Sequence, residues 1–312
     1  MRMPPRKTSF MPKTQTDSSS SRSVIVLTEE RISSFRKKVL EEGKALYRDF
    51  PWRKQSDPYK VLVSEIMLQQ TQTVRVLRYF ERFIERFPTI DALSSASVSD
   101  VLEAWQGLGY NRRALMLKKC ADECSLRYRG VLPSTYEELI KLPGIGPSTA
   151  AGVMVFAHGV AAVYLETNVR SVYIREFFEG QSDVSDKEII ALIKQTCPET
   201  DVDVWYCALL DLGAHIKTTE QNYSRQSKTY AKQSTYEGSD RQLRAEIIRM
   251  VLSAPEGMGI SAVVDGISAF ERKKNRGPVG EERIRKLLTR LEREGFLFLE
   301  DAGTVFCADS SR

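Results

Sequence analysis

The sequence has 312 residues, of which 42% are hydrophobic and 28% charged, and its formal net charge is +5. These values are typical of a globular chain of about two domains, since one hydrophobic core serves about 100 to 200 residues. No apolar run approaches the roughly 20 residues of a membrane-spanning helix, and the N-terminus has no apolar signal-peptide core. We therefore expect a cytoplasmic protein, nucleoid-associated if bacterial, without membrane contact.

Cysteine and histidine usage limits the chemistry. The five cysteines are odd in number and show no CxxC or Cys/His metal spacing: Cys120, Cys124, Cys197, Cys207 and Cys307. Cys120 and Cys124 would share a helix face, where ordinary buried thiols are expected. With only two histidines in the chain, carboxylates are the main candidates for acid–base chemistry.

Residues 1–24 carry several cations and a run of serines, and are predicted to be a disordered basic arm. From about Glu29 to Glu294 apolar residues recur at helical spacing, as in Val76, Phe80 and Phe83. The stretches "SVSDVLEAWQGLG" and "PSTYEELIKLPGIG" each open with a capping residue and end with glycine. Almost nothing before Phe296 alternates with period two, so the main body is predicted to be all-α.

The stretch "LPGIGPSTAAGVMVFAHG", Leu142 to Gly159, predicts a helical hairpin. Gly144 and Gly146 permit a tight turn, and Pro147 opens the next helix. Backbone N–H groups at such a helix start can hold a phosphate, and a plain helical hairpin is the alternative when "PGIG" is considered alone.

The stretch "AVYLETNVRSVYI" places Glu166 directly before a second predicted helix start. Its neighbours Thr167 and Asn168 are good N-cap residues, and an acid at a helix N-terminus meets the positive end of the helix dipole. Capping by these neighbours therefore accounts for the local pattern without any chemistry.

Residues 217–237 are polar and interleave lysines and arginines with tyrosines. Either a solvated linker or a segment lying along a phosphate backbone fits this composition.

Residues 238–308 follow with three amphipathic helices and two short apolar strands around the turn Asp301–Gly303, the order of a winged helix. The third helix is basic and would enter the major groove, although many winged helices bind protein instead.

The motifs together resemble a known group of DNA repair enzymes. "LPGIG", followed about twenty residues later by the carboxylate of "LETNVRSV", is similar to the helix-hairpin-helix (HhH-GPD) base-excision DNA glycosylases, the superfamily of endonuclease III. Within it, "PWRKQSDPYKVLVSEIMLQQTQTVRVLRYFERFIERFP" and "GLGYNRRALMLKKCA" resemble adenine glycosylases of the MutY type. The resemblance runs from about Pro51 to Lys217, and "SEIMLQQT" is its most discriminating part.

The resemblance implies an all-α, two-lobed HhH-GPD glycosylase core over residues 25–216, with a C-terminal winged-helix-like unit over 238–308. A six-helix lobe would span about residues 57–164, and residues 25–56 with 165–216 would form the second lobe. The cleft between the two lobes would bring Glu65 and Glu166 together.

Cleaving the bond between a purine and deoxyribose requires a proton on the leaving base and stabilisation of positive charge on the sugar. The resemblance gives Glu65 the role of general acid, and Glu166 that of the carboxylate that faces the sugar cation and directs water. The family usually has Asp at the second position, and the extra methylene moves the carboxylate by about 1 to 1.5 Å. Ser148 stands where bifunctional relatives carry a Schiff-base lysine, which predicts a monofunctional enzyme.

The resemblance also implies a DNA-contacting set. Gln69 and Gln70 would enter the space left by the flipped base, while Tyr110 and Arg112 would line the cleft, packing being the alternative for this last pair. We assign the other contacts to Gly144, Gly146, Ser148, Asn168, Arg225, Lys228, Arg285 and Arg290. The expected partner is double-stranded DNA with a mismatched or damaged base, bound by a monomer.

Relatives hold an iron–sulfur cluster through four cysteines after the "DLGA" helix. The corresponding positions here are Lys217, Ser224, Ser227 and Gln233, none of which supplies a thiolate. We therefore expect no cluster, no metal and no organic cofactor. The C-terminal domain with which the family recognises 8-oxoguanine is also not evident, and the winged-helix-like unit stands in its place.

These features predict a monofunctional glycosylase that excises adenine mispaired with guanine or 8-oxoguanine. One alternative keeps the fold and removes uracil or thymine from mismatches, since a pyrimidine leaves without protonation at N7. The other is a lesion-binding protein without catalysis, because of the change at Glu166.

Overall fold

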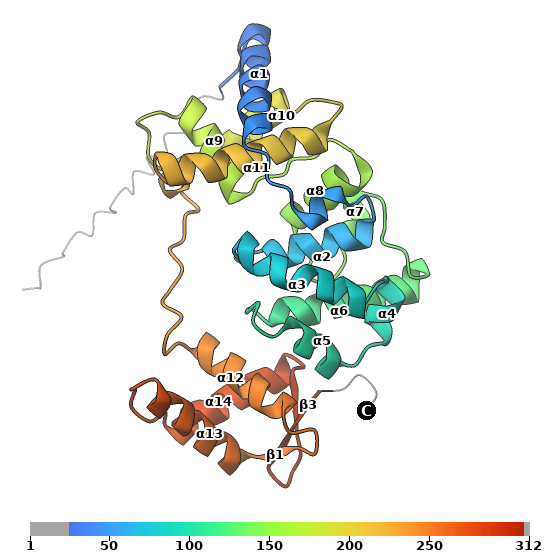
Figure 1. Ribbon diagram of the computed structural model, residues 1–312, viewed down its shortest axis with the longest axis vertical. Helices are drawn as coiled ribbons and strands as arrows, with labels where there is room; N and C mark the ends of the chain where they lie inside the picture. The colour runs from blue at the N-terminus through green and yellow to red at the C-terminus, as the bar shows by residue number, and fades with distance from the viewer. Residues whose placement is uncertain (1–24, 309–312) are drawn as a thin grey trace, which may run out of the picture.

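The computed structural model describes residues 25–308, so the basic arm expected over residues 1–24 lies outside the described part. The chain forms two helical lobes and a smaller C-terminal unit, stacked along the long axis of the molecule (Figure 1). A long segment runs down one side and joins the upper lobe to the C-terminal unit. Within residues 25–308, no helix is both long and apolar enough to cross a bilayer.

The middle lobe is built from one 3₁₀ turn and seven helical segments. These are η1 (Pro51–Lys54), α2 (Pro58–Leu68), α3 (Thr73–Arg86), α4 (Ile90–Ser95), α5 (Val98–Trp105), α6 (Arg112–Tyr128), α7 (Tyr136–Leu139) and α8 (Pro147–His158). Ser97 caps α5 by accepting from the Asp100 backbone N–H at 3.0 Å, as its sequence predicts. Phe83 and Trp105 are fully buried and meet edge to face with ring centroids 5.7 Å apart.

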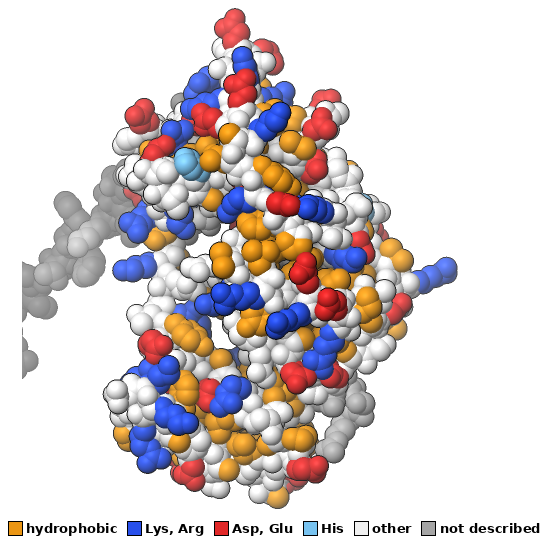
Figure 2. Space-filling model, viewed as in Figure 1, with side chains coloured by type: hydrophobic (Ala, Val, Ile, Leu, Met, Phe, Trp, Pro, Cys, Tyr) orange, Lys and Arg blue, Asp and Glu red, His pale blue; other side chains and the backbone are white. Residues whose placement is uncertain are grey.

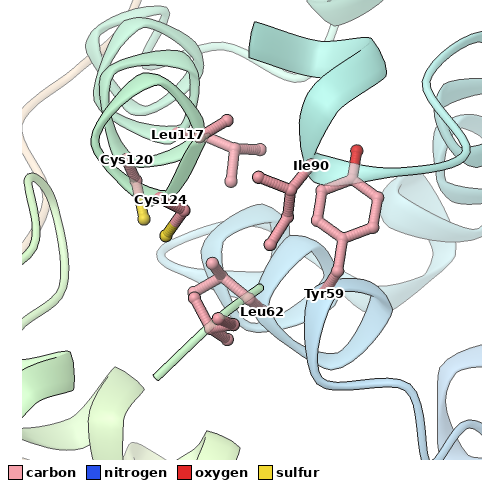
Figure 3. Close-up of a pocket in the computed structure, with 8 residues that line it drawn as sticks. Tyr59, Leu62, Ile90, Leu117, Cys120 and Cys124 are labelled. Carbon is pink, nitrogen blue, oxygen red and sulfur yellow. The ribbon is translucent and has the colours of Figure 1, made fainter. Parts of the chain in front are cut away.

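The two cysteines that share a face of α6 lie in the interior of this lobe. Figure 3 shows Cys120 and Cys124 directed from α6 toward Leu62 of α2. Both are free thiols, and each is at most 1% exposed. The expectation that they are ordinary buried thiols is confirmed.

The helix expected in "PSTYEELIKLPGIG" is much shorter than its sequence suggests. Only α7, a single turn of four residues, forms, and its N-cap Thr135 makes no capping hydrogen bond. The Thr135 hydroxyl instead donates to the side chain of Glu138 at 2.9 Å. The prediction of a side-chain cap was wrong, because the carboxylate outcompetes the backbone for this hydroxyl.

The upper lobe consists of α1 (Glu29–Ala45), α9 (Thr167–Phe177), α10 (Asp186–Thr196) and α11 (Val202–Thr219). Two glycines allow its helices to pack closely. A Cβ on Gly43 of α1 would lie 2.4 Å from the Cβ of Ala208, and one on Gly213 would lie 2.2 Å from the carbonyl oxygen of Asn168. The close contact between α11 and α9 fixes where α9 begins, and with it the position of Glu166.

A buried ion pair joins the crossing segment between the lobes to α11. Asp211 is fully buried and accepts from Arg48 Nε and Arg53 Nη1, each at 2.6 Å. Arg53 Nη2 also donates to Asp211 Oδ1 at 2.9 Å. This bidentate arrangement compensates the buried charge and fixes the residues that lead into α2.

The C-terminal unit contains α12 (Asp240–Leu252), β1 (Met258–Gly259), α13 (Ile260–Lys273), α14 (Glu281–Arg293), β2 (Leu297–Leu299) and β3 (Thr304–Cys307). The three helices and the hairpin of β2 and β3 form where the sequence predicts them. The strands pair antiparallel in the order β1-β3-β2, with Phe298 opposite Phe306. Strand β1 was not predicted, because two residues are too few to show an alternating pattern.

Candidate active site between the lobes

Glu65 is a carboxylic acid inside an otherwise apolar helix. Asp57 starts α2 by accepting from the Tyr59 N–H at 2.9 Å, with Pro58 in the first turn. Val61 to Met67 are all buried, so this part of α2 lies in the protein interior on every side. Glu65 is only 9% exposed as a result.

Two groups from other segments contact the Glu65 carboxyl. The Tyr164 hydroxyl lies 3.3 Å from Glu65 Oε1 and donates to it. On the other side lies Gly152 of α8, where a Cβ would come within 2.2 Å of Glu65 Oε2. The glycine therefore provides the space that the second carboxyl oxygen occupies.

The surroundings favour the neutral form of Glu65. Burial raises the pKa of Glu65 to about 8, and the nearby Glu166 carboxylate acts in the same direction, whereas the Tyr164 hydrogen bond lowers it. At neutral pH the Glu65 side chain is therefore mainly a protonated carboxylic acid, the form that a general acid needs.

Glu166 is itself the N-cap residue of α9, with extended backbone angles, and α9 begins at Thr167. The expectation that Thr167 or Asn168 caps this helix is therefore wrong, since both lie within its first turn. The Glu166 carboxylate makes no capping bond but accepts from Ser148 Oγ at 2.5 Å. The Glu166 carboxylate is thus bonded to the first turn of α8.

The hairpin itself forms as its glycines require. Gly144 has φ +77°, and a Cβ there would lie 2.6 Å from the Cβ of Met116 on α6. Gly146 is the N-cap residue of α8 and Pro147 follows it, with open space around Gly146. The start of α8 is therefore accessible, and Ser148 lies in its first turn beside Glu166.

Arg113 holds together the loops at the mouth of the cleft, a role that the sequence did not reveal. Arg113 Nη1 donates to the carbonyl oxygens of Ile66, Met67 and Gln69, at 2.8, 2.9 and 2.6 Å. Arg113 Nη2 donates to Thr71 Oγ1 at 3.0 Å and to the Gly109 carbonyl oxygen at 2.9 Å. Burial lowers the pKa of Arg113 to about 10. Its neighbour Arg112, selected from sequence, is exposed instead. The motif "NRR" contains nothing that distinguishes the two.

The two glutamines of "LQQT" have different roles. Gln69 Nε2 donates to Thr149 Oγ1 of α8 at 3.0 Å, which ties the end of α2 to the hairpin helix. Gln70 is exposed, with φ +52°, a left-handed conformation that is unfavourable for a residue with a side chain. The structure therefore leaves Gln70 in solvent on a strained backbone.

Tyr110 connects the middle lobe to the C-terminal unit. Its hydroxyl accepts from Arg241 Nη1 of α12 at 2.6 Å and also from Gln233. The guanidinium groups of Arg113 and Arg241 lie 5.5 and 5.4 Å from the centre of its ring. The ring therefore lies close to two cations, one from the middle lobe and one from the C-terminal unit.

The segment after α11 does not fit an iron–sulfur cluster. Ser224 Oγ donates to Asn222 at 2.6 Å, and Ser227 Oγ lies 2.9 Å from Thr229 Oγ1, so the two buried serines already have hydroxyl or amide partners. In the described residues, no group of three or more His, Cys, Asp or Glu side chains could hold a metal ion. The loop is held instead by backbone bonds of 2.9 Å that join Val184 to Gln226 and Lys228.

The remaining predicted DNA contacts lie on separate surfaces. Arg225 and Lys228 are exposed on the segment after α11. Arg285 and Arg290 are exposed on α14, in the C-terminal unit, where cationic and acidic side chains are interspersed (Figure 2). Asn168 is half-buried in the first turn of α9. The structure thus brings Glu65, Glu166, Ser148 and Gln69 close to one another, and leaves the cations of α14 on another unit.

Comparison with known proteins supports the family assignment. Residues 63–293 match the model of the HhH-GPD superfamily base excision DNA repair protein. An adenine DNA glycosylase of Buchnera aphidicola is 38% identical over 173 residues, which are 54% of this chain and 48% of that protein. An adenine DNA glycosylase of Mycobacterium tuberculosis is 34% identical over 234 residues, covering 67% of this chain and 75% of that one. The chain therefore spans about half the length of the first relative and three quarters of the second.

Solved structures agree with this result. A thermostable thymine-DNA glycosylase superimposes with a TM-score of 0.56 at 26% identity, covering 62% of this chain and 91% of that one. Endonuclease III in a trapped DNA complex superimposes with a TM-score of 0.54 at 21% identity, covering 61% and 88%, which demonstrates a shared fold. The chain belongs to the HhH-GPD superfamily of base excision DNA repair proteins and is a homologue of the adenine DNA glycosylases.

Proposed function

We propose that the protein is a monofunctional DNA glycosylase that hydrolyses the N-glycosidic bond of adenine mispaired with guanine or 8-oxoguanine. The main observation in support is the pair of carboxyl groups in the cleft. Burial raises the pKa of Glu65 to about 8, and Glu166 lies close enough to contribute to that shift. A purine leaves more readily once it is protonated, so a neutral acid beside a second carboxylate suits this reaction.

In the proposed reaction the target adenine leaves the helix and enters the cleft, because the reacting bond is inaccessible in the duplex. Glu65 gives its proton to a purine ring nitrogen, the glycosidic bond breaks, and its electron pair goes to the base. Glu166 faces the positive charge that develops on the sugar and directs water to C1′. The water loses a proton as it adds, which leaves an abasic site.

Ser148 supports the monofunctional part of the proposal. Its hydroxyl donates to Glu166, and it offers no amine that could form a Schiff base with the sugar. The same hydrogen bond offers an explanation for Glu in place of the usual Asp, since it holds the longer side chain back against the hairpin. Strand cleavage would then need a separate step after base removal.

The DNA contacts of this proposal lie partly beside the two carboxyl groups and partly on separate surfaces. We assign Gln69 and Gln70 to the space left by the flipped adenine, Tyr110 and Arg112 to the DNA-facing surface beside it, and the hairpin at Gly144 and Gly146 to a phosphate. The exposed cations Arg225, Lys228, Arg285 and Arg290 would add affinity by neutralising further phosphates. The C-terminal unit would act as a winged helix, and one chain would suffice for binding.

A second candidate function is the removal of thymine from a mismatch, which is favoured by the similarity to a thymine-DNA glycosylase. Glu65 separates the two candidates. A pyrimidine has no N7 to protonate, so a neutral buried acid at this place contributes little to its departure.

The test is a single-turnover incubation with duplexes that carry adenine, uracil or thymine opposite guanine or 8-oxoguanine. We expect abasic sites only in the adenine duplexes, with strand breaks only after alkali. Glu65→Gln should reduce the rate by about 10² to 10⁴-fold while DNA binding is retained. Thymine release without adenine release favours the second candidate, strand breaks before alkali contradict the role given to Ser148, and release of no base indicates a lesion-binding protein.

A further inference from the structure

Tyr164 is fixed beneath the active site by contacts on several sides. It is 4% exposed and lies between α8 and α9. Its ring meets those of Phe156 and Tyr206 edge to face, each with centroids 5.4 Å apart. Its backbone N–H donates to the Tyr206 hydroxyl at 3.2 Å, and that hydroxyl donates to the Ala162 carbonyl at 2.6 Å. The Tyr164 side chain therefore has little freedom to move away from Glu65.

The Tyr164 hydroxyl acts as a donor to Glu65. Burial, and after it the electrostatic effect of the Glu65 and Glu166 carboxyl groups, holds the pKa of Tyr164 well above its ordinary value, so the phenol keeps its proton. The acceptor is Glu65 Oε1 at 3.3 Å. A donor at this oxygen distinguishes the two oxygens of the carboxyl group.

A neutral carboxylic acid has one carbonyl oxygen, which accepts, and one hydroxyl oxygen, which donates. With Tyr164 donating to Oε1, the proton of Glu65 lies on Oε2. Gly152 borders Oε2, and the Cβ of any other residue at this position would come within 2.2 Å of it. Tyr164 and Gly152 together therefore select the proton-bearing oxygen and keep space around it.

We propose that Tyr164 is a positioning residue for the acid step, which makes Oε2 of Glu65 the oxygen that protonates the leaving purine. The inference rests on the proposed function. The proton moves from Oε2 to a ring nitrogen, and the electron pair of the broken glycosidic bond goes to the base. Water adds at C1′ and releases a proton to solvent, while Glu65 is left as a carboxylate that Tyr164 still stabilises. Solvent then restores the proton on Glu65.

Three titratable groups face Glu65 from the neighbouring segments: Glu166 at the start of α9, Tyr164 before it and Cys207 on α11. Burial raises the pKa of Cys207 to about 11, so its thiol stays neutral over the working range. The Glu166 carboxylate raises the pKa of Glu65, and the Tyr164 hydrogen bond lowers it. Loss of the Tyr164 hydroxyl should therefore raise the pKa of Glu65.

The experiment is the single-turnover rate of adenine release from pH 6 to 10 for the whole protein and Tyr164→Phe. In the wild type the rate should fall above about pH 8, where Glu65 loses its proton. In Tyr164→Phe this fall should move to higher pH by about one unit, and the plateau should drop about 10-fold because the carboxyl is less well oriented. Tyr173→Phe is the matched control, because Tyr173 is equally buried but pairs with Thr196 at 2.5 Å. It should keep the wild-type profile.

A Tyr164→Phe profile that superimposes on that of the wild type, at the same plateau, would overturn the inference. If Tyr164→Phe loses its helical circular dichroism signal, Gly152→Ala is the second test of the inference, because the alanine Cβ would crowd Oε2 of Glu65. It should reduce adenine release about 10-fold with DNA binding retained, and an unchanged rate would again overturn the inference. A wild type that releases no adenine contradicts the proposed function itself, whereas an active wild type with an unaltered Tyr164→Phe contradicts only the role of Tyr164.

Discussion

The cleft between the lobes and the C-terminal unit are held in place in different ways. Around the candidate active site, buried and half-buried side chains bond to segments that are distant in sequence, as Arg113 does to the Gln69 loop and Asp211 to Arg48 and Arg53. The C-terminal unit meets the core at Tyr110, through Arg241 of α12 and through Gln233 on the exposed segment before it.

This difference implies that one region positions the catalytic groups, whereas the other contributes DNA affinity. Removing one partner of a buried bond leaves the other without compensation and costs about 1 to 3 kcal/mol, or more when a charge is involved. Exposed polar contacts contribute about 0 to 1 kcal/mol. Substitutions around the cleft should therefore change stability and reaction rate together, whereas substitutions in the C-terminal unit should mainly change DNA affinity.

The largest effect is expected for Arg113→Ala. It removes the donors of five acceptors at the mouth of the cleft, so the free energy of unfolding should fall by about 3 kcal/mol and adenine release by about 100-fold. Thermal denaturation and single-turnover assays measure the two quantities. Arg112→Ala is the control for stability, because this neighbour is exposed and should change the free energy of unfolding by less than about 0.5 kcal/mol. A larger loss for Arg112→Ala would reverse our assignment of the two arginines.

The next effect is expected for Glu65→Gln, in the way the free energy of unfolding changes with pH. Because the pKa of Glu65 is raised to about 8 in the folded protein from 4.5, the folded state binds more protons between these values, and the wild type loses stability as pH rises through them. Glutamine cannot ionise, so the variant should become progressively more stable than the wild type as pH rises from about 4.5 to 9. This advantage should disappear below about pH 4.5.

Urea denaturation at several pH values measures this difference. Glu282→Gln on α14 provides a control from the other region, since the Glu282 side chain is 84% exposed and pairs only with Lys286 in the next turn. Its effect should stay within about 0.5 kcal/mol at each pH. A Glu65→Gln variant that follows the wild type from pH 5 to 9 would mean that Glu65 is not held neutral by its surroundings.

Local sequence patterns were sufficient to predict the longer elements of both regions. The hairpin at Gly144, the Ser97 cap and the three helices of the C-terminal unit depend on contacts within a few residues, which a short sequence window contains. The single turn α7 and the two-residue strand β1 depend on neighbours elsewhere in the chain. Their lengths are set by tertiary contacts, which local patterns do not record.

The residues of the candidate site also divide into those that the sequence identifies and those that it does not. Glu65, Glu166 and Ser148 could be selected because they lie in motifs, and the contact of Ser148 with Glu166 spans only 18 residues. Arg113 and Tyr164 could not be selected from the sequence, because their roles depend on contacts across 44 and 99 residues of sequence. The cap at α9 was misassigned for a related reason, since the Glu166 carboxylate turns to Ser148 and not to its own helix.

A smaller effect is expected for Arg241→Ala, which removes the contact of the C-terminal unit with Tyr110. Stability should change by less than about 1 kcal/mol, because the bond is a partly exposed polar contact. DNA affinity should fall about 3- to 10-fold, because the C-terminal unit is then less well oriented beside the cleft. Fluorescence anisotropy with a mismatched duplex measures this affinity. Arg249→Ala is the control, since Arg249 pairs with Glu246 on the same helix. A loss of stability as large as that of Arg113→Ala would show that the junction is structural.

The smallest effect is expected for Arg290→Ala on α14. Its guanidinium lies 4.0 Å from Asp240, at the limit of an ion pair, whereas Arg285 is paired with Glu281 at 2.7 Å. Arg290 is therefore the freer of the two to neutralise a phosphate, and its loss should reduce the slope of log affinity against log salt by about one. Titrations at several salt concentrations measure that slope. An unchanged slope for both Arg290→Ala and Arg285→Ala would mean that α14 does not contact the DNA backbone. The exposed cations of α14 would then be better explained as part of a surface for protein.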